Sequence, residues 1–235
     1  MERLQKVIAN YGYCSRRKAE ELIKNKKVYV NGKLITEMGV KVSLNDDIVV
    51  NNIHLKQQKK VYYLLNKPRG IICSAHDDKG RKTVVDLIKT NLRIYPIGRL
   101  DYDTTGLILL TNDGELSQKL MHPKNNIEKL YVAKLNKIIR MEDYYKIKKG
   151  LEIEGRKVFP TKLKIRSKDK EKDTCIIDIV IIEGRNHIVK KIFLSLGYDV
   201  VKLKRESYDF LTLGNLKSVE YRELSIKEVH KLYSK

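Results

Sequence analysis

The sequence predicts an α+β protein with a small N-terminal domain at residues 1–50, a linker at 51–60 and a larger domain at 61–235. Helical spacing followed by a turn signal in the first fifty residues predicts two helices and a hairpin. The linker, NNIHLKQQKK, is polar and lysine-rich. The elements expected after residue 60 mix strands and helices without regular βαβ alternation, which favours α+β over a doubly wound sheet.

The N-terminal domain has the apolar spacing of two short helices. The first helix is expected to stop at Gly12, and Ser15 is the expected N-cap of the second, which runs through Ile23. A hairpin is expected next, because Asn31-Gly32 is a tight-turn signal between the short apolar segments on either side.

The larger domain is expected to combine a sheet with flanking helices. Strands are expected at 61–65, 70–74, 107–111, 130–135, 162–166, 174–182 and 200–204. Helices are expected at 83–89, 115–121, 141–149 and 186–196. A last helix should begin after Ser225, because Ser225 and Glu228 have the spacing of a capping box.

The charge balance favours a polyanionic partner. The chain has 49 Lys and Arg against 29 Asp and Glu, a formal net charge of +20. Lys and Arg that neutralise phosphates release condensed counterions, which favours binding to nucleic acid. Coding bias toward Lys is a second explanation, in which the charge says nothing about partners.

Neither a membrane nor an oxidising compartment is expected. No apolar run approaches the roughly 20 residues of a spanning helix, and the N-terminus lacks the apolar core of a signal peptide. Cys14, Cys73 and Cys175 lie far apart and fit no metal-binding spacing. Reduced thiols and a cytoplasmic location are therefore expected, with no metal and no cofactor.

Three basic residues, Arg16, Arg17 and Lys18, fall in the first turn of the second predicted helix. Cations there oppose the helix dipole at a cost of roughly a few tenths of a kcal/mol each. A phosphate bound at the same end would offset that cost and accept hydrogen bonds from the free backbone N–H groups. A solvated basic surface is the alternative.

The segment Gly98–Gly114, GRLDYDTTGLILLTNDG, places polar side chains directly before an apolar strand. Asp101-x-Asp103 is compatible with a surface turn. With Thr105 it also matches the nucleophile motif of haloacid-dehalogenase phosphatases, although Pro96 and Gly98 interrupt the strand which that motif requires. A calcium loop is disfavoured, because its last ligand position would fall on Asn112.

Residues 2–48 resemble the small RNA-binding fold first seen in ribosomal protein S-four. The resemblance is carried by RLQKVIANYGYCSRRKAEELIKNKKVYVNGKLI. Gly98–Gly114 resembles the catalytic motif of ribosomal RNA pseudouridine synthases of the RsuA/RluB/RluE/RluF family. DDKGRKTVVDL and EKLYVAKL are most similar to the RluB type, which acts on large-subunit RNA. This resemblance implies a mixed, mostly antiparallel sheet in the larger domain and assigns the catalytic carboxylate to Asp101 rather than Asp103.

Other motifs of the family recur along the chain. NKPRG, at residues 66–70, resembles its first motif, and Tyr131 lies where the family has an active-site tyrosine. EGRNHIVKKIF, at 183–193, resembles its third motif, in which the basic partner of the catalytic Asp falls on Lys190. Lysine supplies the charge of the usual arginine but not its planar fork. We expect His187 to start a helix or contact RNA.

The resemblance implies an enzyme that isomerises a uridine of ribosomal RNA, bound as a structured stem-loop or assembly intermediate. Asp101, Tyr131 and Lys190 are the expected catalytic residues, and a monomer is expected. A small-subunit target and a non-catalytic RNA-binding assembly factor remain alternatives. The expected RNA or substrate contacts are Arg16, Arg17, Lys18, Lys26, Lys27, Lys67, Arg99 and Arg185.

Overall fold

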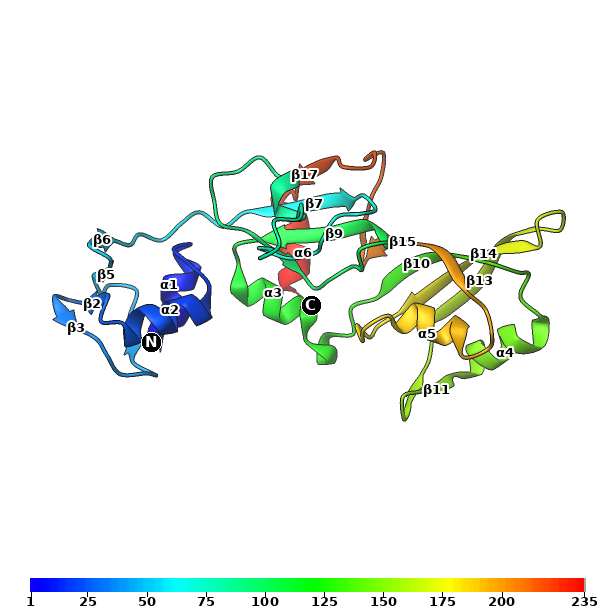
Figure 1. Cartoon of the computed structure of the whole chain (residues 1–235), viewed down its shortest axis with the longest axis horizontal. Coiled ribbons are helices and arrows are strands. Elements are labelled where there is room, and N and C mark those ends of the chain that lie inside the picture. Colours follow the sequence, from blue (N-terminus) through cyan, green and yellow to red (C-terminus); the bar gives the residue numbers. More distant parts are fainter. Residues whose placement is uncertain (235) are drawn as a thin grey trace. The chain divides into compact units, whose positions relative to one another are not determined.

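The computed structural model describes residues 1–234, and the chain forms two compact units (Figure 1). Unit 1 consists of residues 1–61 together with two later segments, 89–95 and 111–114. Unit 2 consists of residues 62–88, 96–110 and the chain from residue 115 onward. No helix among the described residues is both long and apolar enough to cross a bilayer.

Unit 1 contains the two helices and the hairpin that the sequence predicts. Helices α1 (Leu4–Asn10) and α2 (Arg16–Lys24) precede a sheet. The order of that sheet is β3 (Lys33–Leu34), β2 (Val28–Val30), β5 (Ile48–Val50) and β6 (Ile53–His54). A second sheet pairs β1 (Glu2–Arg3) with β4 (Lys41–Val42). Strand β6 falls in the segment expected to be a linker.

Local sequence signals explain the start of α2 and the hairpin turn. The Ser15 side chain accepts a hydrogen bond from the Lys18 backbone N–H at 3.1 Å, as expected of an N-cap. Asn31 and Gly32 both have positive φ, 50° and 77°, as a two-residue turn that matches the strand twist requires.

Unit 2 is built on a mixed sheet whose strands lie in the order β13, β14, β10, β15, β9, β7 and β17 (Figure 1). Their bounds are β13 (Lys162–Asp169), β14 (Thr174–Ile181), β10 (Lys129–Leu135), β15 (Val200–Tyr208), β9 (Thr105–Thr111), β7 (Tyr62–Lys67) and β17 (Tyr221–Glu223). Strand β16 (Leu211–Thr212) pairs with β15, and β8 (Tyr95–Ile97) pairs with β9. A separate hairpin joins β11 (Leu151–Ile153) to β12 (Arg156–Val158).

Helices flank the two ends of this sheet. A continuous apolar core joins Leu64, Leu107 and Leu109 of the sheet to α3 (Gly114–Met121) and α6 (Ile226–Tyr233). Helix α5 (Ile188–Leu194) packs against β15 and β11, and α4 (Met141–Lys149) lies on the same side of β13 and β14 as α5 does (Figure 1). Two single 3₁₀ turns, Val85–Leu87 and Pro123–Asn125, complete the elements.

The β9–β15 junction is the only parallel strand pairing among the registers described, and it joins the two halves of the sheet through two residue pairs. Thr105 lies opposite Lys204, and Gly106 lies opposite Arg205. A Cβ atom on Gly106 would lie 2.2 Å from the Arg205 carbonyl oxygen, and φ at Gly106 is +105°. Glycine is therefore required there, because any side chain would overlap the neighbouring backbone.

Two predicted elements of unit 2 are wrong. The expected strand at 70–74 is a loop in which Ile72 forms an isolated bridge with Thr83. The expected helix at 83–89 is reduced to the turn Val85–Leu87, because the chain is already extended at Ile88. The Asp86 carboxylate accepts hydrogen bonds from the backbone N–H and the hydroxyl of Thr83, so the start of the turn is capped but the helix does not continue.

The capping box of α6 yields a prediction about stability and pH. Glu228 accepts from the Ser225 backbone N–H at 2.8 Å and from Arg222 at 2.7 and 2.8 Å. The bonds from Arg222, with those from Ser225, lower the pKa of Glu228 to about 2. Because the pKa is lowered in the folded state, the stabilisation is complete above the usual glutamate pKa and disappears as pH falls toward 2.

Glu228→Gln should therefore lower the free energy of unfolding by about 1–2 kcal/mol at pH 7, because it removes the charge that faces Arg222. Urea unfolding at several pH values measures the difference from wild type, which should shrink between about pH 5 and pH 2. A difference that stays constant over this range would contradict the assigned cause.

Candidate active site

A buried lysine holds the loop that carries Asp101. The Lys67 side chain is fully buried at the end of β7. Its Nζ donates to the backbone carbonyls of Asp101 and Thr104 at 3.1 and 2.9 Å, and to that of Pro68 at 3.1 Å. Burial lowers the pKa of the Lys67 ammonium, while the nearby Asp101 and Asp103 carboxylates oppose that shift.

Further bonds fix the same loop. The Gly70 backbone N–H donates to the Tyr102 carbonyl at 2.8 Å, and Gly70 has the left-handed φ of 79°. Thr104, itself buried, donates its backbone N–H to the Asp101 carbonyl at 3.2 Å. Its hydroxyl lies 3.4 Å from Asp101 Oδ2. The segment Asn66–Gly70 and the Asp101 loop thus form one hydrogen-bonded structure.

Two side chains of the third motif approach the Asp101 carboxylate. Lys190 Nζ lies 3.3 Å from Asp101 Oδ2, and His187 Nε2 lies 3.1 Å from Oδ1. The side chains of Asp101 and Lys190 are 26% and 24% exposed, so the pair is accessible from outside while remaining partly shielded. The structure therefore brings together Asp101 and Lys190, two of the three predicted catalytic residues.

Lys190 also binds the second carboxylate of the loop. Its Nζ lies 2.7 and 3.0 Å from the two oxygens of Asp103, closer than to Asp101. The hydrogen bond from Lys190 lowers the pKa of Asp103. An ammonium has three N–H donors and can bridge two carboxylates that a planar guanidinium would contact with a different geometry.

Tyr131, the third predicted catalytic residue, does not contact Asp101 but belongs to the strands beside it. It is buried on β10, and its hydroxyl accepts a hydrogen bond from Arg205 Nη1 at 3.4 Å. Arg205 Nε donates to the Leu107 carbonyl at 2.7 Å, while its Nη2 is buried without a partner among the described residues. Arg205 thereby links Tyr131 to β9, the strand that follows the Asp101 loop.

The residues predicted to bind RNA differ in accessibility. Lys67 is wrongly predicted as an RNA contact, because its ammonium is buried among backbone carbonyls. Arg185 is half-buried, is paired with Glu183 and donates to the Ile153 carbonyl at 2.8 Å. The remaining predicted contacts are exposed: Arg16, Arg17, Lys18, Lys26, Lys27 and Arg99.

Two contacts of the site were not foreseen. His187 is the N-cap of α5, in agreement with the expected helix start, and it has the left-handed conformation. Its contact with Asp101 was not expected. The signal was its spacing of three residues before Lys190, which places both on one side of a helix start. Arg205 was also missed, although an arginine at an inward-facing position of a strand signals a buried polar contact.

The geometry also decides between the interpretations of the Asp-x-Asp-x-Thr segment. Asp101 lies in the loop between β8, which ends at Ile97, and β9, which begins at Thr105, whereas a phosphatase nucleophile would lie directly at the end of a strand. Gly106 and the residues after it belong to the strand, so no calcium loop can form there. Among residues 1–234, no three His, Cys, Asp or Glu side chains are grouped as metal ligands.

Comparison with known proteins identifies the family. Residues 61–195 match the RNA pseudouridylate synthase family, and residues 2–48 match the S4 domain. Ribosomal large subunit pseudouridine synthase B of Bacillus subtilis is 55% identical over 99% of this chain and 96% of its own length. An uncharacterised RNA pseudouridine synthase of Aquifex aeolicus is 38% identical over 98% of this chain and 93% of its own.

The fold agrees with this result. A crystal structure of a pseudouridylate synthase covers 99% of this chain and 100% of its own with a TM-score of 0.70 and 33% identity. The resemblance and the α+β class inferred from the motifs are thereby confirmed. The chain belongs to the RNA pseudouridylate synthase family and carries an S4 domain at its N-terminus.

Proposed function

We propose that this chain isomerises a specific uridine of large-subunit ribosomal RNA to pseudouridine, with Asp101 as its catalytic carboxylate. The observation that carries the assignment is the Lys190 ammonium beside Asp101. Lys67 holds the loop of Asp101 through hydrogen bonds to its backbone carbonyls. The relative that shares 55% of its residues over nearly the whole chain supports a large-subunit target. The enzyme acts as a cytoplasmic monomer without a cofactor.

The reaction breaks the C1′–N1 bond of uridine, rotates the uracil, forms a C1′–C5 bond and transfers the C5 proton to N1 through a base. The target nucleotide must first leave its stack, at a cost of roughly a few kcal/mol that contacts in the site offset. Asp101 then acts as an ionised carboxylate, either by attacking C1′ or by promoting a glycal. Tyr131 stacks on the uracil and removes the C5 proton.

Lys190 and His187 keep the Asp101 carboxylate oriented toward the ribose. Their contacts with opposite oxygens of the same carboxylate limit its rotation. Such preorganisation reduces the reorganisation needed in the transition state. A vestigial enzyme domain in an RNA-binding assembly factor would have no need of this arrangement, so catalysis is the favoured function.

The catalytic role of Asp101 predicts that Asp101→Asn lowers tritium release from RNA labelled at uridine C5 by at least about four orders of magnitude. RNA affinity in a filter-binding assay should change little. Asp103→Asn is the matched control, since Asp103 lies in the same loop and shares Lys190 but is not assigned a chemical role. A larger loss in the Asp103 variant would overturn the assignment.

The charge of Lys190 predicts a graded series. Lys190→Ala should lower kcat by about a hundredfold or more, because a preorganised charge beside Asp101 is lost. Lys190→Arg should keep most of the activity, because the charge is retained. Single-turnover kinetics measure both variants. An alanine variant as fast as wild type would show that Lys190 does not serve Asp101.

The position of Lys67 predicts a different kinetic signature. Lys67→Met should lower kcat at least about tenfold with KM for RNA nearly unchanged, because the loop carbonyls lose their donor. Asn66→Ala is the matched control: Asn66 is also buried but bonds the Leu216 carbonyl, away from the loop. Equal losses of kcat in two variants of equal melting temperature would refute a positioning role.

The identity of the target uridine can be mapped directly. Carbodiimide adducts on pseudouridine stop reverse transcription, so stops should appear at one position of large-subunit ribosomal RNA only when the enzyme is present. A new stop confined to small-subunit RNA would contradict the proposed target.

A further inference from the structure

The four strands β13, β14, β10 and β15 have one face that no described helix of unit 2 covers. Along β10, Tyr131, Ala133 and Leu135 are buried, while Val132 and Lys134 between them are half-buried. Figure 1 shows α4 and α5 on one side of these strands, and no described helix lies on the other. We call this uncovered side the open face.

The open face is basic except at one end. Its side chains include two acids among the strands, Asp178 and Glu206, and two more at that end, Glu128 and Asp209. Against them stand six cations: Lys134, Lys162, Lys164, Arg166, Lys202 and Lys204. Arg166 binds the two acids among the strands, with Nε 2.7 Å from Asp178 and Nη2 2.9 Å from Glu206. Arg166 therefore largely neutralises Asp178 and Glu206.

Several lysines of this face form no ion pair with any residue of the described chain, namely Lys134, Lys162, Lys164 and Lys202. Lys134 on β10 lies directly opposite Lys202 on β15 in the strand register. Like charges at directly opposed positions of a sheet are destabilising. The folded sheet thus keeps a repulsion that a bound polyanion would remove.

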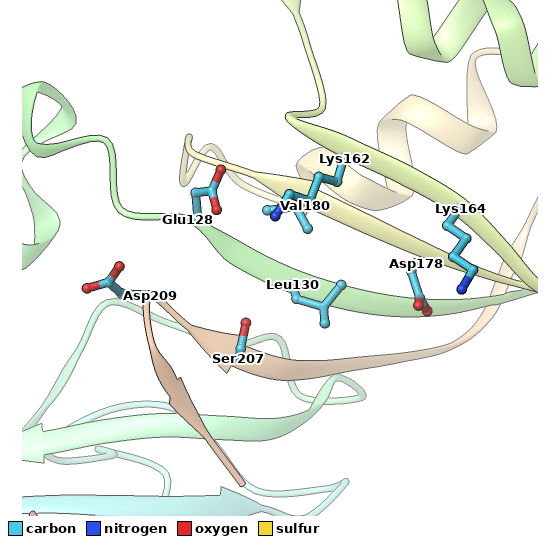
Figure 2. Close-up of a pocket in the computed structure, with 8 residues that line it drawn as sticks. All are labelled: Glu128, Leu130, Lys162, Lys164, Asp178, Val180, Ser207 and Asp209. Atoms are coloured by element: carbon cyan, nitrogen blue, oxygen red, sulfur yellow. The ribbon is translucent and has the colours of Figure 1, made fainter.

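The distribution of charge also indicates where a polyanion would lie. A hollow of about 350 Å³ lies on this face. Figure 2 shows Leu130 and Val180 on the strands that line it. Glu128 and Asp209 lie together at one end of the hollow, and Lys164 lies at the other beside Asp178, one of the acids that Arg166 binds (Figure 2). Acids at the first end repel phosphates, so the favourable path crosses the strands beyond Lys164.

We propose that the open face is a second RNA-binding surface, which takes the sugar-phosphate backbone of ribosomal RNA through Lys134, Lys164 and Lys202. These side chains lie on β10, β13 and β15, so the path is about 14 Å wide at the usual strand spacing, enough for two or three phosphates. The apolar residues of the face are aliphatic, so bases do not stack there and the contact is independent of sequence.

The proposal rests on RNA as the partner of this chain, which its family provides. It adds a contact on the side of the sheet opposite to α5, the helix that carries Lys190. Ribosomal RNA longer than the target stem-loop would reach both sides, so the open face should strengthen binding to long RNA more than binding to a minimal stem-loop.

The test compares two triple variants that remove the same charge. Lys134→Gln, Lys164→Gln and Lys202→Gln together remove the proposed contacts. The control combines Lys148→Gln, Lys149→Gln and Lys227→Gln, three exposed lysines of α4 and α6 with no ion pair to a described residue. Affinity for a transcribed large-subunit RNA domain is measured by filter binding across a range of salt concentrations.

The open-face variant should bind the long RNA about tenfold or more weakly at low salt. Its plot of log affinity against log salt should become shallower by about 2, since each lost phosphate contact removes roughly 0.7–0.9 from the slope. The control variant should change the slope by less than about 1. Thermal melting of the open-face variant should not fall below wild type, because the repulsion between Lys134 and Lys202 is removed.

Equal losses of RNA affinity in both triple variants would show that the open-face lysines act only through the net charge of the protein, and would overturn the proposal. Unchanged RNA affinity in the open-face variant would overturn it as well. The proposed isomerase activity is tested separately, by tritium release from the wild-type enzyme. Its failure is therefore distinguishable from a failure of the RNA-binding proposal.

Discussion

The active site depends on one buried ammonium. In place of water, the carbonyl oxygens of Pro68, Asp101 and Thr104 surround the Lys67 ammonium, so a single side chain at the end of β7 fixes the conformation of the Asp101 loop. A charge without solvent is costly unless its donors are satisfied. The loop must therefore adopt this conformation for Lys67 to be buried, and Lys67 must be buried for the loop to adopt it.

The Lys190 ammonium completes the site from the opposite side. It bridges Asp101 and Asp103, so two negative charges in one short loop are held near one positive charge. The Asp103 carboxylate, the closer of the two, shares a donor that would otherwise serve Asp101 alone. Lys190 thus divides its charge between two acids, while a cation remains beside the carboxylate proposed to be catalytic.

Sequence could predict the elements whose signals are local. The Ser15 cap, the Asn31-Gly32 turn and the capping box of Ser225 all form as expected, because each depends on residues within a few positions. The predictions at 70–74 and 83–89 are wrong, because these two segments pair with each other through Ile72 and Thr83, and no local signal indicates that pairing. Asp101 and Lys190 followed from motifs. The burial of Lys67 and the choice of Tyr131 as the partner of Arg205 depend on how strands far apart in the sequence pair, which residue spacing does not indicate.

The parallel junction of β9 with β15 limits how the catalytic loop can vary. Only two residue pairs hold it, and Gly106 sits against the Arg205 backbone without room for a side chain. An insertion of one residue between Asp101 and Gly106 would either move Asp101 away from Lys190 or shift β9 by one position, which would exchange the side chains that pack on its two buried faces. The loop can therefore tolerate changes of composition far better than changes of length, because the register of β9 with β15 fixes the number of residues between Asp101 and Gly106.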